Sequence, residues 1–502
     1  MSSEERRITV KEDLTVLLVS PEVAPFAKTG GLADVAGALP LALKRLVNEV
    51  RVVLPLYLEV RKKNLALTPV AQDISVMVGR YRRGGAAYQT DLNKAITVYF
   101  LENDTYYDRD KLYGTSKGDY HDNTERFTFF CKGALELCRK INFRPDIIHC
   151  HDWQTALIPA YLKTIYRDDP FFARTATVFT IHNIGYQGLF EKDAMEITGL
   201  PADAFTMNGV EFYGKVNFLK AGIVYSEVIN TVSKKYSEEI QTPEFGFGLD
   251  GILRYRSEDL FGILNGVDYD EWNPESDRFI AENFSLKRLA GKRACKLDLM
   301  KEFKISDQFS NYPFVGVISR LADQKGFDLL AQIINDMMKL NLVFVLLGTG
   351  DQNYHDLFNR VSKEFPGRTG IRIGFDNALA HKIEAGCDMF LMPSRYEPCG
   401  LNQMYSLKYG TIPVVRATGG LDDTIKNFDP KTGKGNGFKF TSYAAQDLFA
   451  KIREAVALYA DQNAWMQVTR NAMSADFSWG ASAKQYRELY AKALLKRQGK
   501  VR

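Results

Sequence analysis

The sequence predicts an α/β protein made of two doubly wound domains, each a parallel sheet covered by helices. Short runs rich in Val, Ile and Leu alternate with longer amphipathic stretches along the 502 residues. Many of these runs are continuously apolar, which is typical of strands buried on both faces of a parallel sheet. A chain of this length also exceeds one ordinary hydrophobic core. We therefore expect two Rossmann-like halves.

The expected strands fall into two groups, one in each half of the chain. They are 15–20, 50–54, 96–101, 146–150, 176–182, 228–233 and 261–267, followed by 314–319, 342–347, 371–375, 389–393 and 412–415. The boundary is expected at the string 265–268, which gives domains at 1–265 and 266–480 and a terminal helix at 481–502. That helix carries an apolar stripe, which needs a surface to cover. The stripe consists of Tyr486, Leu489, Tyr490, Ala493 and Leu494.

Composition limits the classes of function. The formal net charge of +4 is small for this length, and Lys and Arg are scattered among acidic residues. Such a balance predicts neither a nucleic-acid nor a membrane partner. The first twenty residues hold an apolar run too short for a signal peptide or a membrane span, so a cytoplasmic location is expected. The six cysteines form no C-x-x-C pair, which favours reduced thiols.

A Gly-rich string occurs once near each end of the chain. Residues 29–34 read Thr-Gly-Gly-Leu-Ala-Asp and residues 418–423 read Thr-Gly-Gly-Leu-Asp-Asp, each between an expected strand and a helical stretch. Free backbone N–H groups at a helix start, with the positive end of the helix dipole behind them, attract an anion. Gly pairs also serve ordinary turns, but two copies in matched positions favour a phosphorylated ligand held between two similar domains.

Charged side chains follow other expected strands, where ligands bind in parallel α/β sheets. Arg320 and Lys325 lie five positions apart. A guanidinium and an ammonium together suit a leaving diphosphate, and we favour this interpretation over a pair of solvated surface charges. Glu397 directly precedes Pro398, which keeps its backbone extended and directs its carboxylate toward the cleft. There it could accept hydrogen bonds from sugar hydroxyls or stabilise an oxocarbenium-like centre. An acidic residue favoured by a helix dipole is the alternative interpretation.

Three histidines also lie in or after expected strands. His149 and His151 are two positions apart, so they face the same side, and Asp152 follows them. A metal site is one interpretation, but a third local His ligand is missing, and substrate hydrogen bonding by Asp152 is favoured. His182 ends a strand, a position where a structural hydrogen bond is more common than catalysis.

Other nucleotide-binding patterns are incomplete in this sequence. Gly348-Thr349-Gly350 follows a strand, but Asn353 stands where the dehydrogenase fingerprint G-x-G-x-x-G requires Gly. Neither Gly-rich string contains a P-loop, which argues against ordinary P-loop ATPase chemistry. The D-x-D strings at 108–110 and 268–270 could hold a divalent ion on a diphosphate, yet Arg320 and Lys325 can supply the positive charge that such an ion would provide. No metal is therefore expected.

Several longer strings, spread over nearly the whole chain, are specific enough to indicate a family. They are PEVAP at 21–25, KTGGLADV at 28–35, HDW at 151–153, HNIGYQG at 182–188, NGVD at 265–268, SRL at 319–321, QKG at 324–326, EPCGL at 397–401 and TGGL at 418–421. With them the sequence resembles the bacterial glycogen synthases and plant starch synthases. The resemblance implies a GT-B glycosyltransferase, with the active site in the cleft between two Rossmann-like domains and a C-terminal helix that crosses back to the first domain.

The resemblance also implies a reaction and its residues. Glucose would pass from ADP-glucose to the non-reducing end of an α-1,4-glucan such as glycogen, with retention of configuration, release of ADP and no metal cofactor. The implied catalytic residues are His182, Arg320, Lys325 and Glu397. The implied substrate-binding residues are Lys28, Gly30, Gly31, Asp34, Tyr113, Asp152, Asn183, Asn265, Cys399, Gly400, Leu401, Thr418, Gly419, Gly420 and Leu421.

Carried over by motif, these residues take different tasks. Arg320, Lys325 and the second Gly-rich string would hold the leaving diphosphate, while Lys28 and Gly31 position the donor from the first domain. The residues implied to contact the transferred glucose are Asp152, His182, Asn183, Glu397, Cys399 and Gly400, with Glu397 also favouring positive charge at the anomeric carbon. Tyr113 resembles an acceptor-side aromatic residue.

Two departures from the family pattern stand out. Asp422 occupies a position that is commonly uncharged, and 46–50 lacks a Gly-His pair often found there. Because an inward carboxylate would repel a diphosphate, Asp422 is expected to face solvent or cap the helix. Two alternatives stay open: a related transferase with another sugar nucleotide or a small acceptor, and a glycan-binding protein on an inactive transferase fold.

Overall fold

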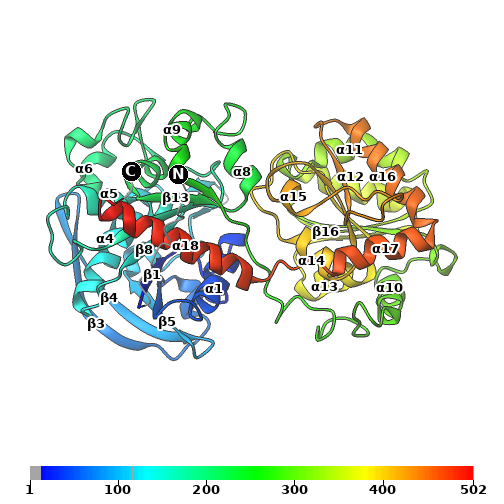
Figure 1. Ribbon diagram of the computed structural model, residues 1–502, viewed down its shortest axis with the longest axis horizontal. Coiled ribbons are helices and arrows are strands. Elements are labelled where there is room, and N and C mark those ends of the chain that lie inside the picture. Colours follow the sequence, from blue (N-terminus) through cyan, green and yellow to red (C-terminus); the bar gives the residue numbers. More distant parts are fainter. Residues whose placement is uncertain (1–12, 116, 501–502) are drawn as a thin grey trace, which may run out of the picture. The chain divides into compact units, whose positions relative to one another are not determined.

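The computed structural model describes residues 13–115 and 117–500, which form two compact units (Figure 1). The first unit contains the described residues up to Val232, then Ser237–Gly266 and the segment that starts at Trp479. The second unit contains Ser233–Tyr236 and Val267–Ser478. The first unit thus ends at Gly266 where 265 was expected, and the terminal segment starts at Trp479 where 481 was expected.

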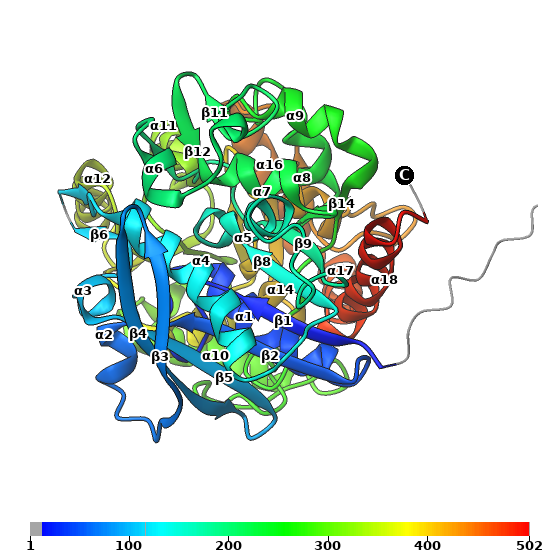
Figure 2. The same ribbon diagram turned by 90° about the vertical axis from the view of Figure 1, so that its left-hand side faces the viewer.

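A nine-stranded sheet with the order β14-β13-β9-β8-β1-β2-β5-β4-β3 forms the first unit. Its parallel strands are β1 (Thr15–Val19), β2 (Glu49–Pro55), β5 (Ile96–Glu102), β8 (Ile147–His151), β9 (Ala176–Ile181), β13 (Val228–Thr231) and β14 (Leu260–Gly262). All of them match expected strands. Figure 2 shows the remaining two, β3 (Thr68–Val78) and β4 (Tyr81–Leu92), as an antiparallel hairpin at one edge. The sequence did not predict them, because they alternate polar and apolar residues instead of forming apolar runs.

Helices and short hairpins connect these strands. The helices are α1 (Gly31–Leu43), α2 (Leu58–Arg61), α3 (Asp104–Tyr107), α4 (Asn123–Lys140), α5 (Leu157–Lys163), α6 (Ala194–Thr198), α7 (Phe218–Tyr225) and α9 (Asp250–Tyr255), while α8 (Lys234–Glu239) contains residues of both units. Two small sheets pair β6 (Gly114–Thr115) with β7 (Gly118–Asp119) and β12 (Lys215–Asn217) with both β10 (Leu189–Phe190) and β11 (Glu211–Phe212).

The terminal helix α18 (Trp479–Arg497) packs on the first unit, against α1, β8, β9 and β13 (Figure 1). Its buried side includes Tyr486, Leu489, Tyr490 and Ala493 from the expected stripe. Burial of such a stripe stabilises the helix far more than its intrinsic propensity does. The first unit is therefore the surface that the stripe covers.

The second unit has a six-stranded parallel sheet with the order β17-β16-β15-β18-β19-β20. Its strands are β15 (Phe314–Ile318), β16 (Val343–Gly348), β17 (Thr369–Ile373), β18 (Met389–Met392), β19 (Ile412–Arg416) and β20 (Phe438–Phe440). Only β20 was not expected. Its helices are α10 (Ala290–Phe303), α11 (Phe327–Met337), α12 (Gln352–Glu364), α13 (Asn377–Gly386), α14 (Asn402–Lys408), α15 (Gly419–Thr424), α16 (Ala445–Tyr459) and α17 (Gln462–Met473).

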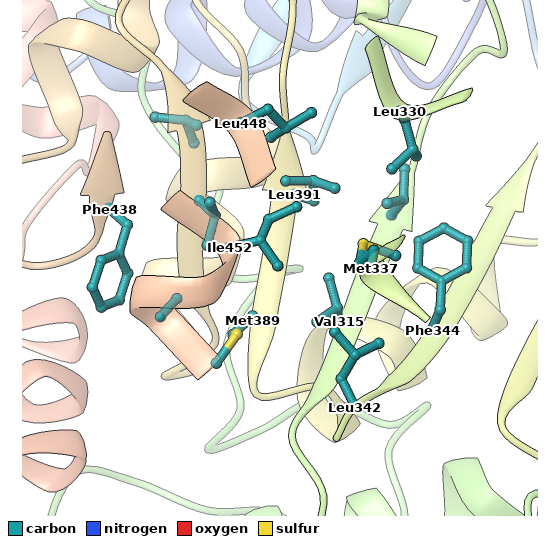
Figure 3. Close-up of a cluster of buried hydrophobic side chains, with 14 of the residues drawn as sticks. Val315, Leu330, Met337, Leu342, Phe344, Met389, Leu391, Phe438, Leu448 and Ile452 are labelled. Carbon is teal, nitrogen blue, oxygen red and sulfur yellow. The ribbon is translucent and has the colours of Figure 1, made fainter. Parts of the chain in front are cut away.

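Helices cover both faces of this second sheet. Successive residues of a strand point to opposite faces, so Val315 and Phe344 pack with α11, α12 and α16 in one hydrophobic core. Figure 3 shows part of that core. Phe314 and Val343, one residue earlier in each strand, pack with α10 and α13 in a core on the other face. Apolar side chains on both faces explain the continuous apolar runs, and the two parallel sheets confirm the predicted α/β fold class. Within the described residues, no helix has the length and apolar character needed to cross a membrane.

Candidate active site

Three adjacent strands of the first unit end next to one another and carry the predicted site residues of that unit. In the order β9-β8-β1, His182 follows β9, Asp152 follows β8, and the segment from Glu22 to the first Gly-rich loop follows β1. The carboxyl ends of parallel strands meet at one edge of the sheet. The edge therefore brings together residues that are far apart in the sequence.

Glu22 holds the first Gly-rich loop in place, although the sequence analysis did not identify it as a functional residue. Its buried carboxylate accepts hydrogen bonds from the Thr29 N–H, the Thr29 hydroxyl (2.5 Å), the Gly30 N–H (3.2 Å) and the Tyr113 hydroxyl (2.6 Å). One carboxylate thus links three segments of the site. An acidic residue within the PEVAP string, just before a Gly-rich loop, was the available sequence signal.

Two N–H groups of the first Gly-rich loop are bound within the protein, contrary to the prediction. The N–H groups of Thr29 and Gly30 were expected to be free for a phosphate, but the protein's own carboxylate accepts both of them. Gly31, the exposed first residue of α1, lies next in the chain. Lys28, which is half-exposed, forms an ion pair with Asp34 (2.6 Å) in the first turn of α1. A negative side chain near a helix start is favourable, so Glu22 itself provides the anion that the helix dipole attracts.

Asp152 has a strained backbone and a buried carboxylate. Its φ of 55° and ψ of −179° lie in a region that side-chain-bearing residues rarely adopt. The carboxylate accepts the backbone N–H of His182 (2.7 Å) and that of Asn183. Burial raises the pKa of Asp152 to about 7 against the opposing effect of these hydrogen bonds. Strain of this kind concentrates at functional sites, and a sequence cannot reveal it.

His182 lies beside Asp152 at the end of β9 and is 8% exposed. Its Nε2 is 2.9 Å from Nδ1 of His151, which is fully buried. Burial lowers the pKa of His182 to about 3, so the ring is neutral at physiological pH. Asn183 is half-buried, and its side-chain oxygen accepts the Gly185 N–H (2.9 Å). Asn265, also in the first unit, is buried, and its Oδ1 has no hydrogen-bond partner among the described residues.

The second unit repeats this arrangement at the ends of β15, β18 and β19, which are adjacent in its sheet. A pocket of about 190 Å³ opens at the ends of β15 and β18. Five predicted site residues line it, namely Arg320, Lys325, Glu397, Gly400 and Leu401. The remaining wall includes Phe327, Met392 and Pro393, so a few charged groups stand against an apolar background. Such a composition is typical of small-molecule sites.

Lys325 and Glu397 form an ion pair inside this pocket. The Lys325 Nζ lies 2.6 Å from Oε2 of Glu397, which also accepts the Ser394 hydroxyl (3.0 Å). Glu397 is 6% exposed. The Arg320 guanidinium is exposed and donates to the side-chain oxygen of Gln324 (2.8 Å). One cation of the predicted pair is therefore paired with the carboxylate, and the other lines the pocket and is exposed to solvent.

The second Gly-rich loop packs tightly on the backbone of the EPCGL segment. A Cβ atom at Gly419, whose φ is +45°, would collide with the Glu397 carbonyl oxygen, and one at Gly420 would collide with that of Cys399. The Gly420 N–H points to the carbonyl oxygens of Glu397 and Pro398 (3.2 Å each). This N–H was expected to be free for phosphate, so here too the expectation is corrected. Both glycines allow a close approach of backbone to backbone.

Two more predicted residues of this loop are buried. The side chain of Leu421 is fully buried in the hydrophobic core of the second unit, and its N–H, which was predicted to lie beside the diphosphate, donates to the Thr418 carbonyl oxygen (3.1 Å). Thr418 is also fully buried, and Cys399 is 4% exposed. The carboxylate of Asp422, in the first turn of α15, is partly exposed to solvent and pairs with Lys439 (2.5 Å). That lysine neutralises the unusual acidic residue.

The alternative motifs have other roles in the structure. Gly348 and Gly350 lie so close to the backbone of Ser319 and Leu321 that a Cβ atom would collide there, and so they serve packing between β15 and β16. Arg109, within one D-x-D string, donates to the Asp122 carboxylate from both terminal guanidinium nitrogens (2.7 and 2.5 Å). Across residues 13–115 and 117–500, no three His, Cys, Asp or Glu side chains gather as metal ligands would.

Comparison with known proteins identifies the family. Residues 15–255 match the model for the starch synthase catalytic domain, and residues 300–472 match that for group 1 glycosyl transferases. A glycogen synthase of Koribacter versatilis is 51% identical over 95% of this chain and 98% of its own. One from Geotalea daltonii is 49% identical over 96% and 100%.

Solved structures agree with this result. The catalytic domain of starch synthase IV from Arabidopsis thaliana, bound to ADP and acarbose, superposes with a TM-score of 0.88. It is 33% identical and covers 96% of this chain and 99% of its own. A sucrose-phosphate synthase from Thermosynechococcus elongatus, with 14% identity and a TM-score of 0.57 over 95% of this chain and 98% of its own, shares the fold. The chain is therefore a glycosyltransferase and belongs to the family of bacterial glycogen synthases and starch synthases.

Proposed function

We propose that this glycosyltransferase moves glucose from ADP-glucose to the non-reducing end of an α-1,4-glucan, with retention of anomeric configuration, in the synthesis of glycogen in the cytoplasm. The observation that carries the proposal is the pocket in which Arg320, Lys325 and Glu397 converge. The relatives named glycogen synthase and the starch synthase structure bound to ADP support this donor and acceptor.

In this proposal the two cations bind the diphosphate. A guanidinium holds phosphate oxygens bidentately, and an ammonium supplies a compact charge. Lys325 already pairs with Glu397, so the lysine can divide its three N–H groups between the carboxylate and a phosphate oxygen. These charges stabilise the extra negative charge that develops as ADP leaves. They also remove the need for a metal ion, and we propose that none takes part.

Further residues would bind and orient the sugar. Glu397 would accept a hydrogen bond from a glucose hydroxyl through the lone pairs that Lys325 and Ser394 leave unused. In the first unit, His182 and Asn183 would donate to the transferred glucose, and Tyr113 would lie on the acceptor side. The carboxylate of Asp152 fixes the backbone of His182 and Asn183. Its role in this proposal is therefore to orient these two residues as well as to contact the sugar.

The state of the two carboxylates favours one route to the proposed retention of configuration. A retaining enzyme with a covalent intermediate needs a free carboxylate nucleophile. Asp152 is buried, tied to two backbone N–H groups and has a raised pKa, while Glu397 is paired with Lys325. We therefore favour attack on the same face that the leaving group departs from. The C1–O bond to the phosphate breaks, the acceptor 4-hydroxyl bonds to C1, and its proton passes to a phosphate oxygen of ADP.

Initial rates with two donors test this proposal. Purified protein is supplied with glycogen and either ADP-glucose or UDP-glucose, with and without EDTA, and the new linkage is identified by proton NMR. Rapid incorporation from ADP-glucose into α-linkages, unaffected by EDTA, is the expected result. Transfer from UDP-glucose alone would contradict the donor, and loss of activity in EDTA would contradict metal independence. Retention of glycogen without any turnover would instead favour the inactive glycan-binding alternative.

A further inference from the structure

Three buried histidines form a row behind the proposed sugar site of the first unit. His149 and His151 come from β8, and His182 follows β9. The ring of His151 stands between the other two, with ring centroids 4.2 Å from His149 and 5.2 Å from His182. Its Nδ1 is 2.9 Å from Nε2 of His182, whereas its Nε2 is buried and has no hydrogen-bond partner among the described residues.

The hydrogen bonds of His149 are complete and leave nothing for His151. The Thr180 hydroxyl donates to Oδ1 of Asn230 (2.6 Å), so it must accept at its oxygen from Nε2 of His149 (2.6 Å). His149 is therefore protonated at Nε2, and its Nδ1 accepts from the Tyr490 hydroxyl of α18 (2.9 Å). Tyr486 of the same helix accepts from the Asn230 amide (3.2 Å). This network fixes the His149 ring, against which His151 stacks.

The contact between His151 and His182 allows two proton arrangements. In the first, His151 donates from Nδ1, its buried Nε2 is a bare acceptor, and His182 carries its proton on Nδ1. In the second, His182 donates from Nε2, and His151 is left with a buried N–H that has no acceptor. Buried N–H groups without an acceptor are rarer in proteins than acceptors left unpaired. The first arrangement is therefore favoured, and burial, which keeps all three rings neutral, removes a doubly protonated alternative.

We propose that His151 is a positioning residue, which donates from Nδ1 to Nε2 of His182 and so holds His182 as the tautomer protonated at Nδ1. That nitrogen has no partner among the described residues and is not among the enclosed polar atoms, so it can donate to an oxygen of the transferred sugar. This inference rests on the proposed role of His182 in the transferase site. The HDW string would then have two roles. The carboxylate of Asp152 holds the backbone of His182, and His151 determines which ring nitrogen of His182 carries the proton.

The tautomer can be observed directly. The protein contains six histidines, so two-bond proton–nitrogen correlation spectra of histidine-labelled protein are simple, and His182→Asn assigns the signal of His182. We expect a protonated Nδ1 and a bare Nε2 in the wild-type ring. A ring protonated at Nε2 would overturn the inference without any reference to activity. If the protein proved inactive as a transferase, this spectrum would still decide the question, so the two proposals can fail separately.

Variants add a kinetic test. His151→Leu removes the donor, so the His182 signal should show mixed tautomers and kcat should fall by roughly a hundredfold, the cost of a misplaced catalytic contact. His151→Asn retains an amide N–H near the same position and should restore the wild-type tautomer and most of kcat. His381→Leu is the matched control, because His381 is also fully buried and bonds to Asp277 (2.7 Å) in the second unit. An unchanged His182 signal in His151→Leu, or a shift of that signal in His381→Leu as large as in His151→Leu, would contradict the assignment.

Discussion

Lys325 and Glu397, which lie 72 positions apart in the sequence, meet as an ion pair of 2.6 Å in the pocket of the second unit. The carboxylate is almost fully buried, while the ammonium is partly exposed. Removing either partner would leave the other charge uncompensated, which is costly for a buried group. The proposed phosphate-binding and sugar-binding functions are thus coupled through one contact.

Glu22→Ala should loosen the first Gly-rich loop. It removes the acceptor of two backbone N–H groups and two hydroxyls, and unsatisfied groups of this kind cost about 1–3 kcal/mol. Hydrogen exchange at Thr29 and Gly30 should become faster. Tyr113→Phe, which removes a single donor, is the matched control and should have a smaller effect. Unchanged protection of both amides in Glu22→Ala would show that the carboxylate does not hold the loop.

Asp152→Gly should be more stable than Asp152→Ala. Both variants lose the carboxylate, but only glycine adopts the strained backbone of this position without cost. Glycine loses more conformational entropy on folding than alanine, which offsets part of this advantage. The difference in the free energy of unfolding should therefore be about 1 kcal/mol. Urea denaturation compares the two variants. Equal stability would mean that the strain is absent, whereas transfer activity should be low in both.

The stability of the first unit should depend on pH through two opposing effects. Burial raises the pKa of Asp152 from 3.8 to about 7. Its contribution to the free energy of unfolding is therefore full below about pH 4 and is lost as the pH rises through 7. Burial lowers the pKa of His149 and of His182 from 6.5 to about 3 and also lowers that of His151, so the contribution of these histidines to the free energy of unfolding is full above about pH 6.5 and is lost as the pH falls toward 3. Between about pH 4 and pH 6.5, a rise in pH therefore weakens the contribution of Asp152 and strengthens that of the histidines.

Asp152→Asn separates these effects because it removes only the carboxylate. The free energy that opens β8 and β9, measured by hydrogen exchange at pH 5 and pH 7, should fall more steeply toward acid in this variant than in the wild type. Each titrating group contributes up to about 1.4 kcal/mol per pH unit. Identical slopes for the two proteins would mean that Asp152 does not titrate in this range.

Asp422→Ala should leave the affinity for ADP within about twofold, because Lys439 already neutralises this carboxylate. Lys439→Met should weaken ADP binding by about fivefold, since it leaves an uncompensated negative charge next to the second Gly-rich loop. Isothermal titration compares the two variants. A large gain in affinity on Asp422→Ala would show that the carboxylate repels the diphosphate in spite of its partner.

The sequence predicted the parts of the fold that follow from continuous apolar runs. Strands such as β1 and β16 were found because both of their faces are buried, while β3 and β4 were missed because an edge hairpin alternates polar and apolar residues. The rule that ligands bind at strand ends correctly placed Arg320, Lys325 and Glu397 around one pocket.

The internal partners of the site could not be predicted in the same way. That Glu22 would take the N–H groups of the first loop depends on the turn after β1, and that Gly420 would bond to the EPCGL backbone depends on how β18 and β19 lie side by side. Leu421 belongs to a matching motif but lies in the core, because a motif preserves packing as well as ligand contacts. The backbone strain of Asp152 leaves no mark in the sequence.

The initial rate of glucosyl transfer from ADP-glucose to glycogen, measured for Arg320→Ala and Lys325→Ala, tests the central claim most directly. If these cations stabilise the departing diphosphate, each variant should lose at least about a hundredfold in kcat. Lys339→Ala, which removes an exposed lysine paired with Asp336, should retain the wild-type rate. Near-normal rates in both pocket variants would contradict the assignment of this pocket to the donor phosphates.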